Sequence, residues 1–123
     1  MDGKTKQEIE SAVSEVMCKF LKEQMGERAE AVSVQVVGDT IIVRVKGVLP
    51  PAERYMTKDR EGTKLITELK EKLIERAKPL LETMIKNLTD AEVLDIHSSF
   101  DAGTGERIEI FTLDKDLEGI HQA

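Results

Sequence analysis

His97 is the residue best suited to acid–base chemistry, because histidine is the only side chain whose ordinary pKa lies near neutral pH. Asp95 lies two residues before it, so both side chains would share one face of a strand. The pair could act as a base and the group that orients it. No recognisable motif places a serine or cysteine nucleophile beside them, and we interpret His97 as a surface or interface residue.

Metal-ligating residue types are present without metal-site spacing. His121 lies in the tail, far from His97, and Cys18 is the only cysteine, so neither an intrachain disulfide nor a thiolate cluster is possible. We interpret Cys18 as a partly buried thiol. Three tail acids lack the glycine and final glutamate of a calcium loop: Asp114, Asp116 and Glu118. We predict no metal, no cofactor and no catalytic residues.

Two anion-binding arrangements are possible. Gly103-Thr104-Gly105 could offer backbone N–H groups, but a phosphate-binding glycine loop leads into a helix, and we predict a hairpin turn here. Basic side chains could also gather on the sheet face away from the helices and bind an anion there. The candidates are Arg44, Lys46 and Arg107, with His97 as a fourth. Charged residues on a solvated sheet face are the ordinary explanation.

The same outer face is expected to carry aliphatic residues, namely Val37, Ile42, Ile108 and Ile110. An apolar patch of this kind usually marks an interaction site. We therefore expect self-association, most simply as a homodimer, to bury it.

Composition describes one globular domain. The chain has 123 residues, of which 40% are hydrophobic and 34% charged, and a net charge of −6. The acidic balance argues against nucleic acid as a partner, and no apolar stretch approaches the ~20 residues of a membrane span. The N-terminus lacks a signal-peptide pattern, so we expect a cytoplasmic protein without membrane insertion.

The first half of the chain predicts a helix and a tight hairpin. Thr5 and Glu8 form a capping box before a helix at about 6–25, whose apolar residues recur with helical period. Strands at 31–37 and 40–46 flank Gly38-Asp39, which suits a type II′ turn. That register pairs Val36 with Ile41, Val34 with Val43 and Val32 with Val45 on one face.

The second half predicts a long helix and a second hairpin. An apolar stripe at about 60–88 contains Pro79, which predicts a kinked helix, and Pro50-Pro51 predicts a short helical turn at 52–56. Strands at about 92–100 and 107–113 should pair around a glycine-rich loop. The predicted partners are Leu94 with Leu113 and Ile96 with Phe111 on the buried face, and His97 with Ile110 and Ser99 with Ile108 on the other.

These elements define an α+β fold of two layers, in the order α-β-β-α-β-β. One mostly antiparallel four-stranded sheet would carry both helices on one face. The whole chain, 1–123, would form one domain with a core at about 6–113 and a polar tail at 114–123 that frays.

Three segments together resemble the MpsC family: IIVRVKGVLPPAE at 41–53, RAKPLLE at 76–82 and GERIEIF at 105–111. The resemblance covers the chain from about Ile9 to Leu113. The chain departs from the family at 59–62, where DREG replaces a common Thr-Pro-Glu-Gly helix start, and Asp59 can cap as threonine does. The family is named for a Na⁺-translocating membrane-potential-generating system, which implies a role beside membrane ion or inorganic-carbon transport and supplies no catalytic residues.

Two functional hypotheses follow. The first is a non-enzymatic accessory or regulatory domain that acts through protein–protein contacts, with a membrane transport protein as one candidate partner. The alternative is a small-molecule (anion) sensor or an enzyme that uses His97 and Asp95, with Arg44 or Lys46 holding the anion. A pocket joining these side chains would favour the alternative.

Overall fold

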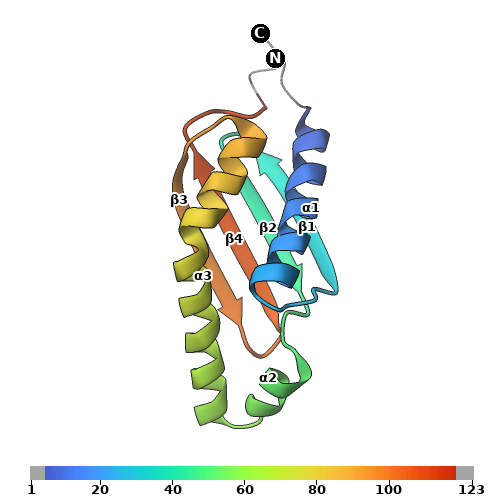
Figure 1. Ribbon diagram of the computed structural model, residues 1–123, viewed down its shortest axis with the longest axis vertical. Helices are drawn as coiled ribbons and strands as arrows, with labels where there is room; N and C mark the ends of the chain where they lie inside the picture. Colours follow the sequence, from blue (N-terminus) through green and yellow to red (C-terminus); the bar gives the residue numbers. More distant parts are fainter. Residues whose placement is uncertain (1–4, 119–123) are drawn as a thin grey trace.

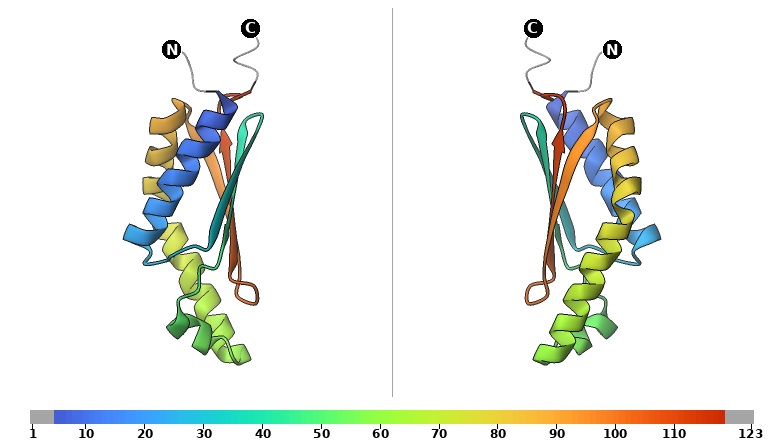
Figure 2. Two further views of the ribbon diagram at one scale, coloured as in Figure 1. Left: turned by 90° about the vertical axis from the view of Figure 1, so that its right-hand side faces the viewer. Right: turned by 90° about the vertical axis from the view of Figure 1, so that its left-hand side faces the viewer.

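The computed structural model describes residues 5–118. Two helices lie on one face of a four-stranded antiparallel sheet with strand order β1-β2-β4-β3 (Figures 1 and 2). This confirms the predicted α+β class and element order. The elements are α1 (Lys6–Gln24), β1 (Ala31–Val37), β2 (Thr40–Lys46), α2 (Pro51–Met56), α3 (Arg60–Thr89), β3 (Val93–Asp101) and β4 (Glu106–Leu113).

Local sequence signals set the helix boundaries. At the start of α1, the Glu8 N–H donates to the Thr5 hydroxyl at 3.1 Å and the Thr5 N–H donates to the Glu8 carboxylate at 2.8 Å, which is the predicted capping box. Asp59 caps α3 by accepting from the Gly62 N–H at 2.7 Å. Helix α3 continues through Pro79, and its axis curves along its length. Helix α2 and the first turns of α3 extend beyond the end of the sheet (Figure 2).

The first hairpin has the predicted register. Val36 pairs with Ile41, Val34 with Val43 and Val32 with Val45. Gly38 has a φ of 61°, as the first central residue of a type II′ turn requires. The turn and the period-two pattern therefore specify the same strand pairing.

The second hairpin is predicted correctly except at one end. Ile96 pairs with Phe111, His97 with Ile110 and Ser99 with Ile108. The predicted pairing of Leu94 with Leu113 is wrong, because an irregularity between Val93 and Asp95 places Val93 opposite Leu113. The Leu94 side chain is consequently 65% exposed, as expected for the extra residue of a bulge.

The core lies between the helices and the inner sheet face. It is aliphatic, with Phe20 and Phe111 as its buried aromatic residues, and α1, α3 and all four strands contribute to it. Representative members are Val13, Met17, Leu21, Val36, Ile41, Val43, Ile74, Leu81, Ile85 and Phe111.

The described part of the tail is held against the domain and does not fray. Leu117 is buried, and its N–H donates to the Gly38 carbonyl at 2.9 Å. The Glu118 carboxylate accepts from the Gly38 N–H at 2.6 Å and pairs with Lys6 at 3.2 Å, contacts that lower its pKa. His121 lies outside the described residues. Within residues 5–118, no helix has the length and apolar character needed to cross a bilayer.

Candidate functional site

The outer face of the sheet is left uncovered, because α1 and α3 lie on the opposite face and α2 lies beyond the end of the sheet (Figure 2). At its centre Ile42 pairs with Ile110, and Ile108 lies two residues before Ile110 on β4. Val37 is 54% exposed. The four predicted aliphatic residues therefore share one face, which we call the outer face together with the polar side chains that surround them.

Charges on the outer face are separated by sign. Arg44 and Lys46 lie near the end of β2, and both are exposed. Acidic residues lie on the neighbouring strands at the same end, and Glu106 pairs with Arg44 at 3.7 Å. Asp101 lies opposite Glu106 on β3. The β2 side of the face is thus basic, whereas the β4–β3 side is acidic.

His97 is exposed and lies on the outer face, with Asp95 two residues before it. It also lines a hollow of about 280 Å³ at the edge of the sheet, together with Glu71, Glu75 and Lys78 of α3. Asp95, Arg44 and Lys46 do not line that hollow. The structure therefore brings three of the four predicted anion-binding residues, Arg44, Lys46 and His97, onto one face without joining them in one pocket.

Arg107 occupies a different place from the one predicted. It was expected on the outer face, but its side chain is fully buried on the inner face. The reason is the strand period of two: Ile108 and Ile110 face outward, so Arg107 and Glu109 must face the helices. Cys18 also differs from expectation, since its side chain is exposed on α1.

Arg107 belongs to a buried charge cluster that the sequence interpretation missed, formed by Glu27, Glu53, Lys70, Arg107 and Glu109. At its centre, Lys70 Nζ lies 2.6 Å from Glu27 Oε2 and 2.5 Å from Glu53 Oε1. Arg107 Nη2 lies 3.5 Å from the same Glu27 oxygen. The cluster thus links α3, α2, β4 and the segment between α1 and β1.

The charges of Arg107 and Glu109, in the other part of the cluster, have fewer close polar partners than that of Lys70. Arg107 Nε lies 3.8 Å from Glu109 Oε2, and the Ser98 hydroxyl donates to that oxygen at 2.9 Å. No hydrogen bond reaches the three guanidinium nitrogens of Arg107 within residues 5–118. Burial raises the pKa of Glu109 to about 7, although Arg107 and Ser98 both favour its charged form.

The cluster leaves a signal in the sequence. Lys70 lies four residues from both Ile66 and Ile74, which are buried on α3, so it occupies the apolar stripe of that helix. Arg107 and Glu109 likewise occupy inner positions of β4. Charged residues at core positions on two facing elements predict a buried ion pair.

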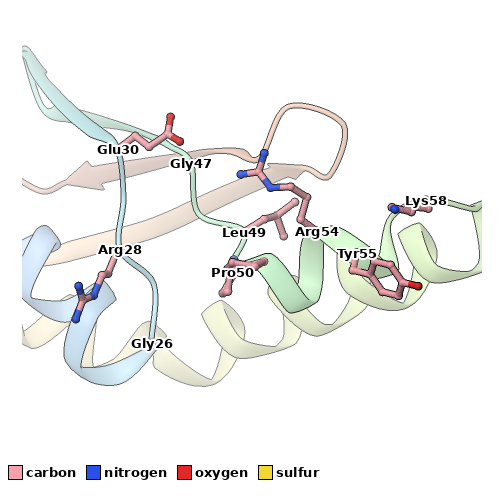
Figure 3. A pocket seen from close by; sticks show the side chains of 10 residues that line it. Gly26, Arg28, Glu30, Gly47, Leu49, Pro50, Arg54, Tyr55 and Lys58 are labelled. Atoms are coloured by element: carbon pink, nitrogen blue, oxygen red, sulfur yellow. The ribbon is translucent and has the colours of Figure 1, made fainter.

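A hollow of about 610 Å³ lies between the α1–β1 segment, the end of β2 and helix α2 (Figure 3). Its walls include Leu49, Pro50, Pro51 and Tyr55, and its charged residues are Arg28, Glu30, Arg54 and Lys58. We call it the basic hollow. Tyr55 is 69% exposed, and Lys58 Nζ lies 4.7 Å from the centre of its ring.

The cluster positions two arginines of the basic hollow. Glu27 and Glu53 point inward to Lys70, and each is followed in sequence by an arginine that lines the hollow, Arg28 and Arg54. Lys70 therefore ties together the two segments that carry these arginines. Metal binding has no comparable support, since residues 5–118 contain no group of three or more His, Cys, Asp or Glu side chains that could hold an ion.

The fold and these surfaces describe a small α+β domain with an open sheet face and a cationic hollow. Comparison with known families gives its relationship: the family model "Na⁺-translocating membrane potential-generating system (MpsC)" matches residues 5–115, and the chain belongs to this family. It is 33% identical over 115 residues to "Uncharacterized protein YbcI" of Bacillus subtilis (strain 168), covering 94% of this chain and 93% of that protein. No solved structure matches the chain.

Proposed function

We propose that this protein is a non-catalytic accessory or regulatory domain that forms a homodimer through its outer face and acts on a protein partner. The observation that carries the proposal is the uncovered outer face, where Ile42, Ile108 and Ile110 form a continuous apolar centre. A two-layer domain buries one face of its sheet against helices. A second copy of the chain would bury the other.

The charges of the outer face favour a second copy as the occupant. A two-fold axis parallel to the strands would place β2 of one copy over β4 of the other. The basic residues Arg44 and Lys46 would then face the acidic side of the partner, including Glu106. The same surface would thus be complementary to itself in charge as well as in apolar character.

The size of the face predicts a modest affinity. Strands about 4.8 Å apart with about 3.4 Å per residue give the four-stranded sheet a flat footprint of roughly 450 Å². A standard interface buries about 800 Å² of accessible surface per partner. We therefore expect a dimer that dissociates on dilution.

Analytical ultracentrifugation over a range of concentrations tests the dimer. Ile42→Asp and Ile110→Asp should each give a monomer, because each places a charge at the apolar centre. Leu65→Asp is the matched control: Leu65 is an exposed leucine on α3, and its substitution should leave the dimer intact. A wild-type monomer at every concentration, or a dimer that only Leu65→Asp disrupts, contradicts the proposal.

The family relationship supports a partner in a membrane transport system, and this is a separate part of the proposal. Affinity purification of the tagged chain from its native cells, with the membrane fraction solubilised, should recover a transport subunit. The Ile42→Asp variant serves as the comparison, because a partner that binds the dimer is lost with it. Recovery of no membrane protein contradicts this part of the proposal and leaves the dimer unaffected.

A further inference from the structure

We propose that the basic hollow binds an elongated organic anion, with two or more negative charges on an apolar or aromatic body. This site lies beyond the proposed dimer face, because the hollow is built from α2 and from the segments that follow α1 and β2. The inference rests on the shape, the charge and the rigid support of the hollow.

The charge of the hollow is opposite to that of the chain. The protein carries a net charge of −6, yet three cations and one carboxylate line this hollow. Within residues 5–118, no ion pair joins Arg28, Arg54 or Lys58 to a carboxylate. The Glu30 side chain lies over Gly47, where a Cβ atom would be only 2.5 Å from its Cγ. Electrostatic attraction therefore favours an anionic ligand.

The walls of the hollow indicate what carries the charge. Leu49, Pro50 and Tyr55 provide an apolar surface, and a volume of about 610 Å³ is within the usual range for small-molecule sites. A planar body can pack on the exposed Tyr55 ring, at the low entropic cost of contacting rigid aromatic and proline side chains. Inorganic anions would leave this surface unused.

The arrangement of the cations indicates an elongated ligand. Figure 3 shows Arg28 and Arg54 extending on different sides of Leu49 and Pro50, with Lys58 beyond the end of α2. The cations thus surround the apolar wall instead of converging on one point. A ligand with separated negative charges could reach more than one of them, whereas a single compact anion could not.

The buried charge cluster restrains the two segments that carry Arg28 and Arg54. Lys70 binds both Glu27 and Glu53, the residues directly before Arg28 and Arg54. This arrangement holds both walls of the hollow in place before a ligand arrives, which lowers the ordering cost of binding. It also gives the fully buried Lys70 a role that an apolar side chain could not fill.

Four probes distinguish the contribution of the ligand's negative charge from that of its aromatic body. Binding of each is measured by ¹⁵N-detected NMR titration at low salt. ADP and naphthalene-2,6-dicarboxylate each combine an aromatic body with at least two negative charges; pyrophosphate has the charge alone and adenosine the body alone. At least one of the first two should bind more tightly than both of the others and shift the amides of 47–58. If ADP alone binds, the ligand is a phosphate ester; if the dicarboxylate alone binds, it is a carboxylate.

Variants confirm the location. Arg54→Gln should weaken binding of the successful probe by about tenfold, as the loss of a charge-assisted hydrogen bond predicts, and Arg54→Lys should restore part of the affinity. Arg76→Gln makes the same charge change at an exposed site on α3 and should leave affinity unchanged. The proposal is overturned if neither ADP nor naphthalene-2,6-dicarboxylate binds, or if pyrophosphate binds as tightly as they do. It is also overturned if Arg76→Gln and Arg54→Gln weaken binding equally.

Discussion

Removing the central cation of the buried charge cluster should destabilise the domain severely. The Lys70 side chain is fully buried and contacts two carboxylates, Glu27 at 2.6 Å and Glu53 at 2.5 Å. Lys70→Met keeps the volume and removes the charge, which leaves Glu27 buried with only Arg107 at 3.5 Å. Breaking a buried ion pair from one side costs about 3–5 kcal/mol.

That cost corresponds to a large shift in melting temperature. For 123 residues, an unfolding entropy of about 2.1 cal/mol/K per residue gives roughly 4 °C per kcal/mol. Lys70→Met should therefore lower the melting temperature by about 12–20 °C, measured by circular dichroism, with urea unfolding giving the free energy. Proteins typically have an unfolding free energy of about 5–15 kcal/mol, so the variant would keep only part of it.

Lys72→Met is the matched control, because Lys72 is an exposed lysine on the same helix and surface substitutions usually change stability by less than about 0.5 kcal/mol. The double variant Lys70→Met/Glu27→Met should cost less than the sum of the two single variants, since the second substitution removes the carboxylate left without its cation. If Lys70→Met costs less than about 1 kcal/mol, the ion pairs are not formed as described and the reasoning fails.

Two further predictions concern Glu109 and the second hairpin. The pKa of Glu109 is raised to about 7 from its ordinary 4.5, so the folded state binds the proton more tightly than the unfolded state, and the free energy of unfolding should fall as pH rises from about 4.5 to 7. Glu109→Gln should remove up to about 3 kcal/mol of that decline in urea titrations at pH 5 and pH 8; an equal pH dependence in both proteins would contradict the burial of this carboxylate. Leu94→Ser should change stability by less than about 0.5 kcal/mol because the side chain is exposed, whereas Ile96→Ala should cost about 2–5 kcal/mol. Equal destabilisation by the two variants in thermal unfolding would indicate that Leu94 pairs with Leu113 in the regular register.

The sequence predicts most of the fold because its local signals agree with one another. The capping box of α1, the Gly38-Asp39 turn and the alternating strands each specify a boundary or register that the structure contains. The bulge at Leu94 could not be predicted this way, since an apolar residue at an expected inner position carries no sign of an inserted residue. The contacts of Leu117 and Glu118 were also missed, because they depend on a turn about 80 residues earlier in the chain.

The candidate sites were less predictable, and for a different reason. The aliphatic part of the outer face follows from strand period alone, and Val37, Ile42, Ile108 and Ile110 lie where they were expected. The placement of Arg107 on that face was wrong because a charged residue was assumed to seek water, although its neighbours fix it to the inner face. The basic hollow depends on how α2 meets two distant segments, which no pattern within a single element specifies.

The buried charge cluster connects these observations. A buried ion pair is often no more stabilising than apolar residues of the same volume, so stability alone does not account for five charged residues gathered between α2, α3, β4 and the α1–β1 segment. Apolar packing has little directionality, whereas Lys70 donates a hydrogen bond to Glu27 and forms an ion pair with Glu53. Arg28 and Arg54 directly follow these two glutamates, so the contacts of Lys70 also restrict where the two arginines leave the backbone. The cost of burying charge is thus better explained by the geometry it imposes on the basic hollow than by the stability it contributes to the core.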